Sequence, residues 1–399
     1  MKANTRGIGV AVLCCLIFAT ACTKSKPASS SWAPKTAAAY LDNRASWWIE
    51  WNGAARDHGT FCISCHTALP YALARPALRP ALAEQGLSAN ELKILDNVIK
   101  RARLWDQVGP YYSDPGYGAK ATESRGTEAV LNALILASHD SESGYLSADT
   151  RTALRNMWAT QQTSGNKTGA WPWLQFDAEP WEANDSAYYG ACLAAMALGL
   201  APGKYAGSPE AQNGLKLLVD YLHRESAAQS TINRVFLLWS STKLPGLLSR
   251  EQQNAIIQEV LSRQQSDGGW RLASIAWRWK GWSVRSLLRM CLLGDGTPLV
   301  RRSDGVATGL VTFVLEEAGV PSDNIQLKRG LSWLMSNQNT AEGFWPAWSI
   351  NRRKSLTSNT GRFMSDAATA YAVLALTTHK APEAPVAASA HYEASSGKK

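Results

Sequence analysis

The sequence predicts an all-α protein, built as a single (α/α)6 toroid of six outer/inner helix pairs. Three observations predict this fold: amphipathic segments alternate with more apolar ones, no stretch has the period-2 alternation of a strand, and a helix ending in Gln followed by Gly-x-Trp recurs. A helix that is apolar on nearly every side must be buried on both sides. The inner helices are therefore expected around a central cavity.

The composition is consistent with one helical body. The 399 residues are 45% hydrophobic and 18% charged, which excludes disorder for most of the chain. The net charge of +9 permits an anionic partner without naming one. The 17 Trp residues, against 7 Phe and 12 Tyr, indicate a repeated structural cause.

Residues 1–21 have the pattern of a signal peptide. Lys2 and Arg6 precede an apolar stretch, residues 7–21, that is too short for a comfortable membrane span. Small residues followed by Cys22 resemble a bacterial lipobox with Cys22 as the lipidated residue, although Ala19 stands where that pattern prefers Leu. An ordinary signal peptide, cut at an A-x-A-like site, is the alternative. We expect an exported protein, lipid-anchored in the bacterial cell envelope and facing the periplasm.

The remaining segments follow in order along the chain. Residues 22–36 are a Pro/Ser/Lys tether for the lipid anchor, residues 37–380 are the toroid, and residues 381–399 are a disordered tail. Outer helices are expected at roughly 37–51, 89–105, 149–162, 209–224, 250–265 and 325–338. Inner helices are expected to begin at His66, Thr127, Asp185, Thr231, Asp304 and Asp366, with Pro70 bending or shortening the first. In a ring of helix hairpins these six N-terminal ends would surround one mouth.

The segment RGLSWLMSNQNTAEGFW, residues 329–345, resembles the QW motif of squalene and oxidosqualene cyclases, and the regions of Gln265 and Gln162 are looser copies. The resemblance implies a toroid of the terpenoid cyclase and prenyltransferase type over residues 37–380. It implies that the Gln caps an outer helix and that the Trp is a structural tie. It also implies an apolar or isoprenoid-like small molecule as ligand.

The family's acid motif is matched only in part. Squalene–hopene cyclases carry DxDDTA, whose central Asp protonates an alkene, whereas Asp304 and Asp366 each stand alone here. Together with Asp185 they are the candidate catalytic residues. Each also precedes an apolar helix, so N-capping is the alternative role. The Asp-x-Cys zinc pair of protein prenyltransferases does not occur in the sequence.

Residues 62–66, CISCH, have the C-x-x-C-H spacing at which c-type haem is attached. The Cys62 and Cys65 thiols would bind the two vinyl groups of one porphyrin, and the His66 imidazole would bind the iron. Met364 is the first candidate for the opposite iron ligand and His58 the second, with simple packing as the alternative for Met364. A Cys62–Cys65 disulfide and a zinc site completed by other ligands are alternatives to haem.

Charged residues are expected near the same mouth. The basic segments 271–302 and 352–354 predict either a solvated face or contact with anionic lipid head groups or an anionic substrate. Glu179 and Glu182 are suited to acid–base chemistry on sugars, with Trp171, Trp173 and Trp181 as the aromatic residues expected to stack on sugar rings. Export makes nucleic acid an unexpected partner.

The main functional hypothesis is a redox or electron-transfer role on an apolar, isoprenoid-like ligand, with covalent haem c as cofactor and a redox partner. A cofactor-free terpene cyclase-like enzyme and a non-catalytic lipid- or glycan-binding protein are the alternatives.

Overall fold

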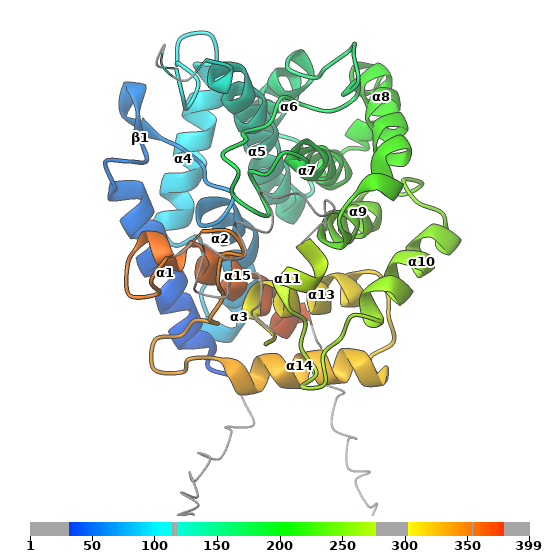
Figure 1. The fold of residues 1–399 in the computed structure, drawn as a ribbon. Helices are drawn as coiled ribbons and strands as arrows, with labels where there is room; N and C mark the ends of the chain where they lie inside the picture. The colour runs from blue at the N-terminus through cyan, green and yellow to red at the C-terminus, as the bar shows by residue number, and fades with distance from the viewer. Residues whose placement is uncertain (1–31, 114–115, 117, 277–301, 353, 379–399) are drawn as a thin grey trace, which may run out of the picture.

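The computed structural model of the chain describes residues 32–113, 116, 118–276, 302–352 and 354–378 (Figure 1). Cys22, the expected signal peptide, the tail at 381–399 and most of the basic segment 271–302 lie outside the described residues. The prediction of an all-α protein is confirmed. Within the described residues, the sheet structure consists of the two short antiparallel strands β1 (Ala55–Arg56) and β2 (Thr60–Phe61).

Each of the twelve expected helical segments contains a helix. The amphipathic, outer segments form α1 (Pro34–Glu50), α4 (Ala89–Arg103), α6 (Ala148–Ala159), α8 (Pro209–Glu225), α10 (Arg250–Leu261) and α14 (Ile325–Asn337). The apolar, inner segments form α2 (Ala68–Ala74), α5 (Lys120–Ser143), α7 (Ser186–Leu200), α9 (Thr231–Lys243), α13 (Gly305–Glu317) and α15 (Phe363–Thr378). Two short helices, α3 (Arg79–Leu82) and α11 (Leu272–Ala276), were not expected.

Several helix ends differ from the expected ones. Helix α1 begins at Pro34, inside the expected tether, because Pro is favoured in a first helical turn. Helix α2 keeps Pro70 in its first turn and ends at Ala74, two residues before Pro76. Helices α5 and α15 begin before Thr127 and Asp366, so these two residues lie inside helices.

The inner helices contact one another in chain order. Helix α5 packs on α7, α7 on α9, α9 on α13 and α13 on α15, and α15 and α5 both pack on α2. The outer helices lie at the periphery in Figure 1. Within the described residues no helix combines the length and the apolar character needed to cross a membrane.

The turns that follow α6, α10 and α14 share one set of hydrogen bonds. In each, a fully buried indole N–H donates to a carbonyl of the preceding outer helix: Trp171 to Met157 (2.6 Å), Trp270 to Val260 (2.8 Å) and Trp345 to Leu334 (2.8 Å). These three Trp residues are structural ties, as the sequence predicts, and they account for part of the high Trp content.

A Gln side chain makes the second tie of each turn. The amides of Gln161, Gln264 and Gln338 donate both to a Gly carbonyl within the turn and to a backbone carbonyl in or directly before the next outer helix; Gln338 reaches Ala33, before α1. The sequence pattern placed two of these ties at Gln265 and Gln162, one residue after Gln264 and Gln161, which make them in the structure. Both places carry a Gln-Gln pair, and only the packing against the next helix selects the first of the two.

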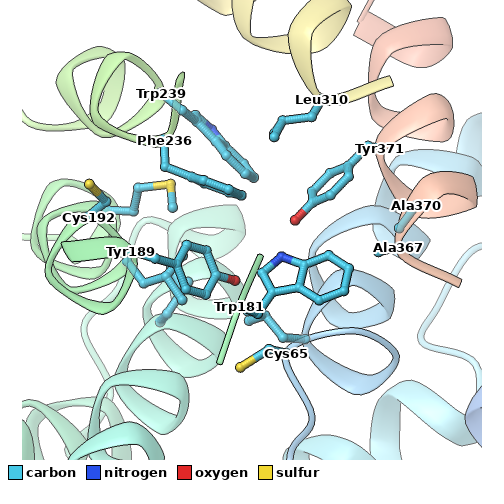
Figure 2. Close-up of a cluster of buried hydrophobic side chains, with 14 of the residues drawn as sticks. Cys65, Trp181, Tyr189, Cys192, Phe236, Trp239, Leu310, Ala367, Ala370 and Tyr371 are labelled. Carbon is cyan, nitrogen blue, oxygen red and sulfur yellow. The ribbon is translucent and has the colours of Figure 1, made fainter. Parts of the chain in front are cut away.

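Aromatic side chains fill the space between the inner helices. Figure 2 shows Tyr189, Phe236, Trp239 and Tyr371 pointing toward one another, with Trp181 entering from the turn before α7. The ring centroids of Tyr189 and Phe236 are 4.6 Å apart, and those of Trp239 and Tyr371 are 6.5 Å apart. The expected central space is thus occupied by these buried rings.

Candidate functional site

The C-x-x-C-H motif lies between the β1–β2 hairpin and helix α2. The Cys62 backbone N–H donates to the Ala54 carbonyl (2.8 Å), and the Trp48 indole donates to the Cys62 carbonyl (2.7 Å). The Ser64 hydroxyl accepts from the backbone N–H groups of Thr67 and Ala68 (3.2 and 3.0 Å), which gives these two N–H groups at the start of α2 a partner. The backbone that carries both cysteines is therefore held on two sides.

Both cysteines are buried free thiols. Cys62 and Cys65 are 6% and 3% exposed. Burial raises the pKa of Cys62 to about 12 and that of Cys65 well above its ordinary value. Thiols in this state are protonated at neutral pH, unlike the thiolates of thioredoxin-like redox sites.

His66 stands against an aromatic wall. Its ring stacks on Phe363 with centroids 3.7 Å apart and meets the edge of Trp48 at 5.2 Å. Its Nδ1 atom lies 2.9 Å from the Thr67 hydroxyl. Burial, with a smaller contribution from Arg44, lowers the pKa of His66 to about 3, so the imidazole is neutral at physiological pH.

A cavity of about 440 Å³ opens beside His66. Met364, from the first turn of α15, lines the same cavity, so the structure brings together the expected iron ligand and its first candidate partner. The second candidate, His58, lies elsewhere: it is at the turn of the β1–β2 hairpin, 3.4 Å from Asp57, with its side chain 46% exposed. Cys62 and Cys65 are not among the residues that line this cavity.

The remaining walls of this cavity are aromatic and charged. Phe176, Trp181, Trp348 and Phe363 are among its apolar lining residues; the charged lining residues are Glu179, Glu182, Arg352 and Lys354. Burial raises the pKa of Glu182 to about 7, opposed by the positive charges of Arg352 and Lys120. Of the residues expected for sugar chemistry, Glu179, Glu182 and Trp181 line this cavity together with part of the basic segment 352–354, whereas Trp171 and Trp173 are buried outside its lining.

None of the three candidate catalytic Asp residues lines this cavity. Asp304 is buried at the N-cap of α13 and accepts hydrogen bonds from the backbone of Ala307 and Leu272 (3.0 and 2.5 Å), and its burial raises its pKa to about 6. Asp185 occupies the N-cap position of α7 without a side-chain capping bond. The capping alternative therefore holds for Asp304 and is wrong for Asp366, which lies inside α15 and is ion-paired with Arg44 (2.7 Å).

Sequence reasoning missed the residues that surround His66. Trp48 and Arg44 belong to α1, and Phe363 precedes Met364 at the start of α15. The adjacency of Phe363 to Met364 was the one available signal, because a residue next to a candidate ligand shares its location. Nothing in the amphipathic pattern of α1 distinguishes Arg44 from the solvated charges of other outer helices.

The residue types match those that hold a c-type haem: the neutral His66 imidazole and the Met364 thioether line one cavity, whereas the two thiols, three residues apart, are outside its lining. A zinc site lacks such support, since in the part of the chain that is described no three His, Cys, Asp or Glu side chains converge to hold a metal ion. Compared with known proteins, the chain matches no protein-family model and no curated sequence.

Proposed function

We propose that the protein is an exported electron-transfer lipoprotein that carries covalent haem c on a toroid of the squalene cyclase type. One observation carries this proposal: His66, which follows Cys65 directly, lines one cavity together with Met364. In this proposal Cys62 and Cys65 would bind the porphyrin, and His66 and Met364 would bind the iron. The haem would supply one-electron redox chemistry.

The helix contacts support the toroid. Neighbour contacts between inner helices follow chain order from α2 to α15 and return from α15 to α2, and the tie made by Gln338 joins the end of α14 to the start of α1. A closed (α/α)6 arrangement accounts for both observations. The aromatic cavity walls support an apolar, isoprenoid-like partner for the redox site.

The cyclase-like alternative has less support. A cyclase acid must protonate an alkene, which requires a carboxylic acid that gives up its proton readily and is held in its protonated form. Asp366 instead faces the Arg44 guanidinium, and both oxygens of Asp366 accept hydrogen bonds. Asp304 accepts backbone bonds as a cap. These partners stabilise the carboxylate form of each group, whereas burial raises the pKa of both carboxyls. The observation that disfavours a cyclase acid is that neither Asp304 nor Asp366 lines the cavity beside His66.

The test is to produce the full chain, with its export signal, in a host that has the haem c maturation machinery. We expect a protein whose mass includes one haem that denaturation and acidic extraction do not remove, and whose spectrum changes on reduction. The Cys65→Ala variant should lose the covalent bond between the haem and residue 65. The Cys192→Ala variant, which removes a buried thiol outside the motif, should retain the haem. A colourless wild-type protein with the mass of the polypeptide and lipid alone would overturn the proposal.

A further inference from the structure

A buried line of hydrogen bonds leads away from His66. Its Nδ1 atom lies 2.9 Å from the Thr67 hydroxyl, which lies 2.7 Å from one oxygen of Asp366. The Arg44 guanidinium binds both oxygens of Asp366 at 2.7 and 2.9 Å, and the Tyr40 hydroxyl donates to one of them at 2.8 Å. Thr67, Asp366 and Arg44 are 2%, 2% and 5% exposed, so water does not compete for these bonds.

The direction of each bond in this line follows from the donor inventory. The Thr67 hydroxyl donates its single proton to the Asp366 oxygen that also accepts a hydrogen bond from the Arg44 guanidinium. The Thr67 oxygen can then meet His66 only as an acceptor, which places a proton on Nδ1. A neutral imidazole protonated at Nδ1 has its lone pair on Nε2, the atom with which a metal-bound histidine most commonly faces its ion.

We propose that Thr67 and Asp366 are positioning residues that hold His66 in the Nδ1–H tautomer, with Nε2 available to the haem iron. This proposal rests on the proposed function for its iron, but the tautomer belongs to the polypeptide itself. It assigns Asp366 a role in orienting His66 in place of the role of a catalytic acid.

The line of hydrogen bonds from His66 through Thr67 to Asp366, called the relay below, also has an electronic consequence for the iron. A carboxyl group that is connected to an imidazole through hydrogen bonds makes the imidazole a stronger electron donor. Carboxylates that accept hydrogen bonds from other metal-bound histidines have the same effect. A stronger donor stabilises oxidised iron. The relay would therefore lower the reduction potential of a haem held by His66.

The fold explains why the relay is rigid. Arg44 and Tyr40 come from α1, Thr67 precedes α2 and Asp366 belongs to α15, so the relay joins the first and last helices of the described chain. The Arg44 guanidinium also donates to the side chain and the backbone carbonyl of Asn359 (3.0 and 2.8 Å). His66 is thus oriented by groups more than 290 residues apart in the sequence.

The experiment compares Thr67→Val, which has the same shape but no hydroxyl, with Thr67→Ser, which keeps the hydroxyl. Tyr40→Phe serves as a third variant, because it removes a bond to Asp366 without cutting the line to His66. In the full chain carrying haem, we expect Thr67→Val to shift the midpoint potential upward and to change the absorption spectrum. Thr67→Ser should resemble wild type, and Tyr40→Phe should shift the potential by less than Thr67→Val.

A second measurement does not depend on haem. Nitrogen NMR of His66 in the full chain, made without the maturation machinery, should report the Nδ1–H tautomer in wild type and Thr67→Ser, and a mixture in Thr67→Val. An Nε2–H tautomer in wild type, or equal potentials and tautomers in all variants, would overturn the relay. If haem fails to attach to wild type, the proposed function fails, and the NMR comparison still decides whether Thr67 and Asp366 orient His66.

Discussion

At the scale of single residues, Glu182 has an unusual acid–base environment for a carboxyl group. Its ordinary pKa is 4.5, and burial raises the value to about 7 in the folded protein. Below pH 4.5 the group is protonated in both the folded and the unfolded chain. As the pH rises toward 7 the unfolded chain releases this proton first, so the contribution of Glu182 to stability is lost as the pH rises.

Glu182→Gln, which stays neutral at every pH, should therefore become more stable relative to wild type between pH 5 and pH 8. Urea unfolding at four pH values across this range measures the difference in the free energy of unfolding. Glu210→Gln is the matched control, because the Glu210 side chain is 52% exposed on an outer helix. A constant difference between Glu182→Gln and wild type over the whole range would contradict the expectation.

At the scale of the elements, glycine decides how closely the turns approach the next outer helix. Gly343 has φ +89°, and a Cβ atom placed on it would stand 2.0 Å from the Thr36 carbonyl oxygen of α1. Gly169 and Gly268, in the two related turns, also have positive φ and would meet the backbone of Leu217 and Arg329. The repeated Gly-x-Trp pattern therefore records a close backbone approach as well as an indole tie.

Gly343→Ala is expected to destabilise the protein by at least ~2 kcal/mol more than Gly319→Ala. Gly319 follows α13 with φ +78°, but a Cβ atom on it meets no atom within 4 Å. Both variants force a residue with a Cβ atom into the left-handed region, so their difference isolates the clash with α1. Chemical unfolding of both variants provides the comparison, and equal losses of stability would show that the approach to Thr36 is not tight.

At the scale of the whole molecule, the sequence predicts that a lipid on Cys22 holds the protein at the membrane. Cys22→Ser should move the protein from the membrane fraction to the soluble periplasmic fraction and remove the acyl mass. Cys15→Ser, inside the apolar stretch of the expected signal peptide, should leave both unchanged. Recovery of wild type as a soluble protein without lipid would instead favour cleavage at an ordinary signal-peptide site.

The sequence was informative about local features for a physical reason. Hydrophobic periodicity reports which side of a segment is buried, so the twelve helices could be located from it. The ends of helices depend on local competition among caps, Pro residues and turns, so the starts of α5 and α15 were placed too late. Of the candidate site, Cys62, Cys65 and His66 could be recognised because they are adjacent in the chain.

The sequence by itself determined the helical class, the repeated Gly-x-Trp turns and the C-x-x-C-H spacing, because each depends on neighbours within a few residues. Only the tertiary structure decided that Met364 and not His58 shares a cavity with His66, and that Asp366 faces Arg44 and Thr67 instead of capping a helix. These contacts join α1, α2 and α15 across the fold. A periodic pattern shows that a face is buried, and only packing determines what that face meets.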